Sequence, residues 1–217
     1  MIVTKKRDFN KLMENIKNHK KVFLLGCSEC AALCGTGGEP ELKEMKETLE
    51  AVGKEVTGLI AVKSGCQVLG TKLELKPFKD VIRNSDCIIV MSCGAGTQTA
   101  AELFEDKSVY PANDTMFLGN MTRFQVFDER CSLCGECILD MTGGICPVTR
   151  CAKGLLNGPC GGSQGGKCEI SPDMPCAWQL IIERLSKTGD IHRLEEIIPP
   201  KNWDQTPTGK QDKKRGK

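Results

Sequence analysis

The chain has 217 residues, a formal net charge of +2 and fourteen cysteines. A chain of this length buries a hydrophobic core as one large or two small domains, so the many cysteines indicate disulfides, a metal site or redox chemistry. The first 21 residues contain no apolar run of signal-peptide length, and the longest apolar stretches are strand-sized. We therefore expect a cytoplasmic protein without a membrane span, whose thiols stay reduced.

The charge distribution argues against nucleic acid as a partner. The last 17 residues hold six Lys or Arg and two Asp, which leaves the rest of the chain close to neutral. This basic end has no interleaved aromatic residues and is expected to be a solvated polar tail. Both histidines, His19 and His192, are expected on the surface. This argues against zinc sites of two cysteines and two histidines, and against Ser-His-Asp catalysis.

Strands and helices alternate in the first half of the chain. The predicted elements are a helix from residue 9, a strand over 20–27, a helix over 39–53, a strand over 55–66, a helical stretch over 73–84, and a strand, tight turn and helix over 86–105. Such alternation predicts an α/β fold, with a small parallel sheet in the flavodoxin-like style over residues 20–115. We place this α/β domain at residues 1–120.

Cysteines stand at equivalent places after the predicted strands. Because parallel strands end at the same edge of a sheet, cysteines from three strand ends and the following turn can meet there. Four thiolates suit one zinc ion or one [4Fe-4S] cluster. The predicted ligands are Cys27, Cys30, Cys66 and Cys93. Cys34 is a reserve ligand, and Cys87, at the opposite edge, is expected to be a buried core thiol. The alternative is that all of these are small buried residues.

The segment "SCGAGTQT" resembles the start of a phosphate-binding turn. Gly94, Gly96 and Thr97 could present backbone N–H groups at a helix N-terminus to a cofactor. The segment lacks the third glycine of a dinucleotide fingerprint, and Cys93 lies within it. We therefore favour metal or cluster binding over phosphate binding at this turn.

A cysteine-rich domain is predicted over residues 121–198, where the chain becomes rich in glycine and loses its apolar periodicity. The segment "CSLCGEC" has C-x2-C-x2-C spacing, and a Cys-Pro pair follows, as in bacterial ferredoxins, although the spacer is longer than in ferredoxins. Eight cysteines are predicted to bind two [4Fe-4S] clusters: Cys131, Cys134, Cys137, Cys146, Cys151, Cys160, Cys168 and Cys176. Two zinc sites of four cysteines each would use the same eight residues, and this alternative to the clusters is kept. The simplest sets are sequential, the first four and the last four, but an exchange between sets is also possible.

A closing helix is predicted from about residue 173, with Asp173 as its N-cap and Gly189 at its end. Its apolar side is formed by Trp178, Ile181, Ile182 and Leu185. A second short helix is predicted near residue 191, before the polar tail at 199–217.

The block "CSLCGECILDMTGGICPVTRCAKGLLNGPCGG", with "GKCEI" and "PCAW", resembles the C-terminal signature of a known family. That family is the small accessory subunit of methylenetetrahydrofolate reductases in acetogenic and related anaerobic bacteria. The segments "GCSEC", "TGGEPEL" and "SGC" resemble its N-terminal part, so the similarity covers nearly the whole chain.

The resemblance implies a partner protein. In that family a flavin-containing (β/α)8-barrel subunit reduces methylene-tetrahydrofolate in the Wood-Ljungdahl pathway, and the small subunit connects its flavin to an electron donor. This chain would then be a non-catalytic electron-transfer subunit. A zinc-stabilised docking subunit without a redox role is the alternative, and an independent enzyme has support only from "SCGAGTQT".

Overall fold

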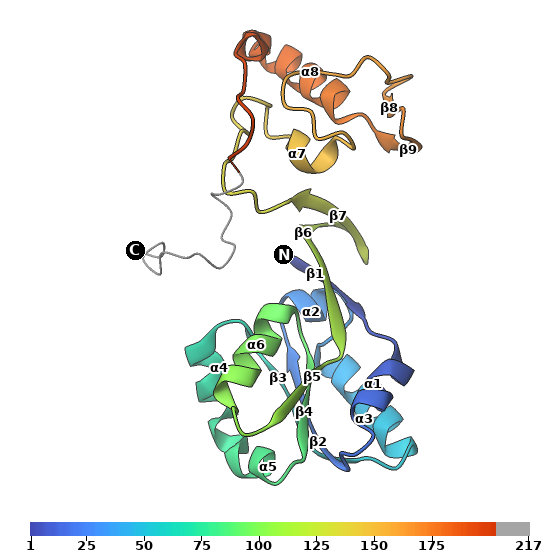
Figure 1. Ribbon diagram of the computed structural model, residues 1–217, viewed down its shortest axis with the longest axis vertical. Coiled ribbons are helices and arrows are strands. Elements are labelled where there is room, and N and C mark those ends of the chain that lie inside the picture. The colour runs from blue at the N-terminus through green and yellow to red at the C-terminus, as the bar shows by residue number, and fades with distance from the viewer. Residues whose placement is uncertain (203–217) are drawn as a thin grey trace. The chain divides into compact units, whose positions relative to one another are not determined.

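The computed structural model describes residues 1–202 and divides into two compact units, with the boundary between Phe127 and Asp128 (Figure 1). The sequence predicts this boundary at residue 120. Most of the expected polar tail, residues 203–217, lies outside the described residues. No helix in the described part of the chain is long and apolar enough to cross a membrane.

The first unit is built on a four-stranded parallel sheet. Its strands are β2 (Lys21–Cys27), β3 (Glu55–Val62), β4 (Cys87–Met91) and β5 (Ser108–Pro111). They lie in the order β3-β2-β4-β5, which is the order of the first four strands in flavodoxin-like folds. The predicted α/β fold with a parallel sheet is therefore confirmed.

Helices cover both faces of this sheet, as Figure 1 shows. One face carries α1 (Phe9–Asn15) and α3 (Glu39–Ala51), whose apolar side chains pack with those of β2 and β4. The other face carries α4 (Val68–Leu75), α5 (Lys79–Arg83) and α6 (Gly94–Leu103), and a 3-10 turn at Lys76–Phe78 links α4 to α5. Both faces of the central strands are thus buried, which explains their nearly continuous apolar sequences.

A second, antiparallel sheet was not predicted from the sequence. It has the order β1-β6-β7, with β1 at Ile2–Lys6, β6 at Asn113–Arg123 and β7 at Val126–Cys131. The domain boundary falls within β7.

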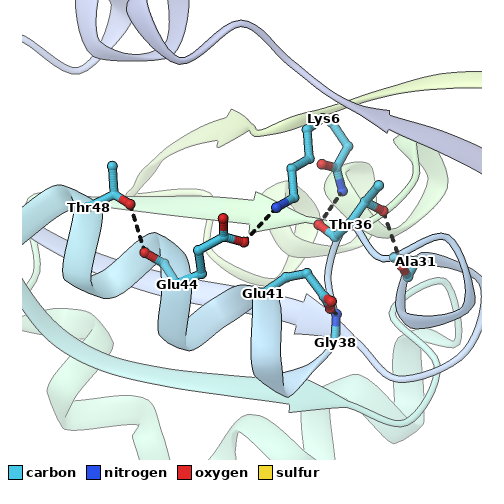
Figure 2. A network of polar contacts seen from close by, with 8 residues as sticks. Lys6, Ala31, Thr36, Gly38, Glu41, Glu44 and Thr48 are labelled. Atoms are coloured by element: carbon cyan, nitrogen blue, oxygen red, sulfur yellow. Dashed lines mark hydrogen bonds and ion pairs between the residues drawn. The ribbon is translucent and has the colours of Figure 1, made fainter.

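Polar contacts join β1 and α2 (Cys30–Leu33) to the elements around them, as Figure 2 shows. Lys6 Nζ of β1 lies 2.7 Å from Glu44 Oε2 of α3, and the Thr36 hydroxyl donates to the Ala31 carbonyl over 3.1 Å. The buried Asn113 side chain, at the start of β6, donates to the Thr36 carbonyl over 3.1 Å. The Thr36 hydroxyl also lies 2.6 Å from the Thr4 hydroxyl of β1, so Thr36 links β1 to the start of β6.

The second unit has little regular structure. It contains α7 (Pro147–Arg150), a β8–β9 hairpin (Lys167–Cys168 and Ser171–Pro175), α8 (Ala177–Thr188) and a 3-10 turn at Ile191–Glu195. Its small core gathers on α8, where Trp178, Ile181 and Leu185 are buried together with Ile145. Ile182 is only half-buried.

The start of the closing helix was predicted wrongly. Asp173 lies in β9 and does not cap a helix; α8 begins after Cys176. The physical reason is Pro175, which holds the preceding residue in an extended conformation. The predicted end is confirmed, because Gly189 terminates α8 with a left-handed φ of 79°.

The expected surface position of His19 is also wrong. This residue is half-buried, and its Nε2 lies 2.9 Å from the Tyr110 hydroxyl. His192 is exposed as expected.

Candidate metal centre

Four of the predicted cysteine ligands line one small cavity in the second unit. They come from separate elements: Cys151 follows α7, Cys160 lies in a loop, Cys168 ends β8 and Cys176 precedes α8. The cavity has a volume of about 20 Å³. These four residues are the last four cysteines of the chain, which is one of the two sequential sets that the sequence suggested.

The environment of Cys160 favours a thiolate. The N–H of Gly162 donates to its sulfur over 3.4 Å, and this hydrogen bond, together with the nearby Lys153, lowers the pKa of the thiol. Lys153 also forms an ion pair with Glu169, and both residues line the cavity. The cavity is therefore lined by four cysteines and by the Lys153–Glu169 ion pair, and the Gly162 N–H and Lys153 favour the thiolate form of Cys160.

The first four cysteines of this unit lie on the "CSLCGEC" loop and just before α7. The N–H of Leu133 donates to the sulfur of Cys131 over 3.4 Å, as Gly162 does to Cys160. This geometry requires an unusual backbone, because Leu133 has a φ of +54° and Gly135 a φ of +76°. The loop therefore turns one backbone amide, that of Leu133, toward a sulfur.

Thr149 of α7 joins this loop to the fourth cysteine of the set. Its hydroxyl lies 2.9 Å from the Ser132 hydroxyl and 3.7 Å from the sulfur of Cys146. Cys134 is buried and Cys137 is exposed. The contacts of Thr149 thus place the loop and Cys146 next to each other.

Positive charge also lies near Cys146. Arg150, at the end of α7, is partly buried, and this desolvation lowers the pKa of its guanidinium, with a further contribution from Arg130. Arg130 is paired with Asp128 over 2.6 Å.

In the first unit, the loops that follow β2, β3 and β4 converge at the carboxyl edge of the sheet. The N–H of Gly65 donates to the sulfur of Cys27 over 3.4 Å. A methyl group placed on Gly65 would lie 3.7 Å from both Cys27 Cβ and Gly96 Cα. These contacts bring the loop after β3 and the start of α6 close to Cys27.

The other three predicted ligands at this edge, Cys66, Cys93 and Cys30, have surroundings that differ from one another. Cys66 is not at a strand end as predicted, because β3 stops at Val62 and the chain then turns at Gly65 toward β2. Cys93 caps α6 and is half-buried. Cys30 accepts the N–H of Ile2 over 3.4 Å, so its sulfur contacts β1.

Two further cysteines of this unit have contrasting surroundings. The sulfur of Cys34 lies 3.9 Å from the carbonyl oxygen of Ile2, beside Cys30. Cys87 is fully buried in the sheet, and burial raises the pKa of its thiol to about 11. Its predicted role as a core thiol is confirmed.

The glycine turn that was compared with a phosphate-binding loop forms the start of α6. The N–H of Gly94 donates to the Thr115 hydroxyl over 2.8 Å, and the Thr97 hydroxyl donates to the Cys93 carbonyl over 3.2 Å. A side chain on Gly96 would collide with Ser92. One of the amides that a phosphate would need is therefore already engaged within the protein.

All fourteen cysteines are free thiols. Within residues 1–202, no group of three or more His, Cys, Asp or Glu side chains has the arrangement of a formed metal site. The residue types nevertheless fit a thiolate-bound metal or cluster, because four cysteines line one cavity and backbone amides donate to two of the eight C-terminal sulfurs.

Three residues of this environment were not found from the sequence. They are Thr149, Lys153 and Glu169. Lys153 and Glu169 lie one or two positions after a cysteine, and this proximity is the signal that could have indicated them.

Residues 110–204 match a protein-family model described as "Methylene-tetrahydrofolate reductase C terminal". The matched part contains all eight cysteines of the second unit. No curated protein and no solved structure matches the chain. The C-terminal part of the chain is thus similar to a domain of methylenetetrahydrofolate reductases, which agrees in part with the resemblance noted from its motifs.

Proposed function

We propose that this chain is an accessory electron-transfer subunit of a methylenetetrahydrofolate reductase. In this role it relays electrons between a donor and the flavin of a (β/α)8-barrel catalytic subunit, in the Wood-Ljungdahl pathway. The folate chemistry takes place on the partner, and a further subunit supplies the electrons.

The observation that carries the proposal is the cavity shared by Cys151, Cys160, Cys168 and Cys176. Four thiolates are the usual ligands of a [4Fe-4S] cluster, and these four lie inside the region that matches the reductase family. The remaining set, Cys131, Cys134, Cys137 and Cys146, holds a second cluster in our proposal.

When bound, a [4Fe-4S] cluster takes up and releases single electrons. The residues around the thiolates have a separate task. The N–H groups of Leu133 and Gly162 stabilise negative charge on the sulfurs of Cys131 and Cys160, and such hydrogen bonds raise the potential of a ligated cluster. Lys153 adds positive charge beside Cys160.

A third cluster is proposed for the carboxyl edge of the parallel sheet. Cys27, Cys30, Cys66 and Cys93 are its ligands, and Cys34 is the reserve. The convergence of the loops at Gly65 supports this part of the proposal. The contact of Cys30 with Ile2 means that this side chain has to turn before it can serve as a ligand.

A zinc-stabilised docking subunit is the second candidate function. The cavity volume of about 20 Å³ favours it, since a single tetrahedral ion needs less room than a four-iron cube. The small apolar core of the second unit is also typical of segments that fold around a structural metal.

Purification under anaerobic conditions separates the two candidates. The electron-transfer proposal expects a brown protein with iron and acid-labile sulfide in equal amounts, and co-purification with a flavoprotein when both are expressed together. A colourless protein that contains zinc without iron, and that still co-purifies with the flavoprotein, would instead support the docking function.

A further inference from the structure

A large groove lies in the first unit, away from every cysteine cluster described above. It runs between α4 and α5 on one side and the end of α6 on the other, and Figure 1 shows these three helices on the same side of the sheet. Its volume is about 670 Å³. Leu75, Ile82 and Phe104 are among the apolar residues that line it.

The charges around this groove are mostly positive. Five cationic residues line it against two acidic ones: Lys72, Lys76, Lys79, Arg83 and Lys107 against Glu102 and Asp106. Arg83 is paired with Asp80, and Lys107 donates to two backbone carbonyls, so these two cations are already engaged. Lys72, Lys76 and Lys79 make no ion pair with any residue in the range 1–202.

Helix α4 exposes apolar side chains next to these lysines. Leu69 is 72% exposed and Leu73 is 71% exposed, whereas Thr71 and Leu75 on the opposite side of the helix are buried. Leu69, Lys72, Leu73 and Lys76 lie within about half a turn of one another around the helix. The outer face of α4 therefore combines two exposed leucines with two lysines. An exposed apolar patch beside charged residues is typical of a surface that binds another protein.

We propose that this groove binds an acidic, amphipathic helix of a partner protein. The apolar residues that line the groove and the exposed leucines of α4 contact the apolar face of that helix. Lys72, Lys76 and Lys79 form ion pairs with its carboxylates. A small anion would fill the cavity but would leave Leu69 exposed, because Leu69 does not line the cavity. This inference goes beyond the electron-transfer proposal and is independent of it, since none of the lining residues is a cysteine or lies within residues 110–204.

The test uses the full chain and a fluorescein-labelled 18-residue peptide of leucine, glutamate and alanine, with leucines at helical spacing. Fluorescence anisotropy measures the dissociation constant. We expect saturable binding, which the double substitution Lys72→Glu/Lys76→Glu weakens by about tenfold or more because it reverses two of the unpaired charges. Leu73→Ala, at a largely exposed site that does not disturb the core, is expected to weaken binding by about fivefold.

Matched controls make the result specific to the groove. Lys11→Glu/Lys17→Glu reverses one exposed lysine in α1 and one just after it, on the other face of the sheet, and should leave binding within about twofold. A peptide of the same composition in scrambled order should bind about tenfold more weakly. Hydrogen exchange should show protection of residues 68–83 and 102–107 in the complex.

Three results would overturn the proposal. They are the absence of peptide binding, equal weakening by the α1 control, and binding to phosphatidylglycerol vesicles without binding to the peptide. The iron content of the protein enters none of these measurements, so failure here and failure of the electron-transfer proposal are distinguishable.

Discussion

The last four cysteines line one cavity, and this predicts how much iron is lost when one or two of them are substituted. If Cys151, Cys160, Cys168 and Cys176 bind one cluster, then Cys160→Ala removes about four iron atoms per chain, the content of one [4Fe-4S] cluster. Adding Cys168→Ala should remove no more, because the same cluster is already lost. Combining Cys160→Ala with Cys134→Ala should instead remove about eight, because the two residues belong to different sets.

The assay is iron and sulfide analysis of anaerobically purified variants, with circular dichroism to confirm that each one folds. Cys87→Ala is the matched control, because this thiol is fully buried within β4 and should leave the iron content unchanged. Loss of about eight iron atoms in the Cys160→Ala/Cys168→Ala variant would refute the grouping, since it would mean that the two cysteines serve different clusters.

Three further predictions concern stability in urea. Gly37→Ala should lower the free energy of unfolding by about 3 kcal/mol, because the added methyl group would lie 1.7 Å from the Met91 carbonyl oxygen. Gly65→Ala is the control: its methyl group would have no neighbour nearer than 3.7 Å, so it should lower that free energy by under about 1 kcal/mol. Trp178→Phe should cost about 2 kcal/mol, because it deletes a buried indole hydrogen bond. Burial raises the pKa of Cys87 from 9.0 to about 11, so the neutral thiol is favoured in the folded chain. Between pH 9 and pH 11 the thiol ionises in the unfolded chain but stays neutral in the folded one. The free energy of unfolding of the wild type should therefore fall by up to about 3 kcal/mol over that range, relative to Cys87→Val. A flat difference between these two proteins would contradict the burial argument.

The parallel sheet was predictable because its determinants are local. The apolar runs at residues 20–27 and 86–91 and the amphipathic pattern at 39–53 each specify one element. The antiparallel sheet was not predictable, because β1 pairs with β6 across more than a hundred residues, with Ile2 opposite Leu118. Most residues of β6 are exposed, so they leave no alternating apolar pattern in the sequence.

The candidate metal centre also has a part that the sequence predicts and a part that it does not. Spacing and composition identified the cysteines, and the cavity now brings four of them to one place. The loops of this unit fold back on one another and so bring Lys153, Glu169 and Thr149 close to the cysteines. Such loop contacts leave no periodic pattern in the sequence. The start of α8 could have been read correctly from Pro175, which is a stronger local signal than the N-cap preference of Asp173.

The most direct test of the account is the quantitative measurement of iron, acid-labile sulfide and zinc in the anaerobically purified wild-type chain. The electron-transfer proposal predicts about eight iron and eight sulfide per chain for the C-terminal clusters, about twelve of each if the sheet-edge cluster is also present, and a visible absorption that bleaches on reduction. Stoichiometric zinc with neither iron nor sulfide would contradict it.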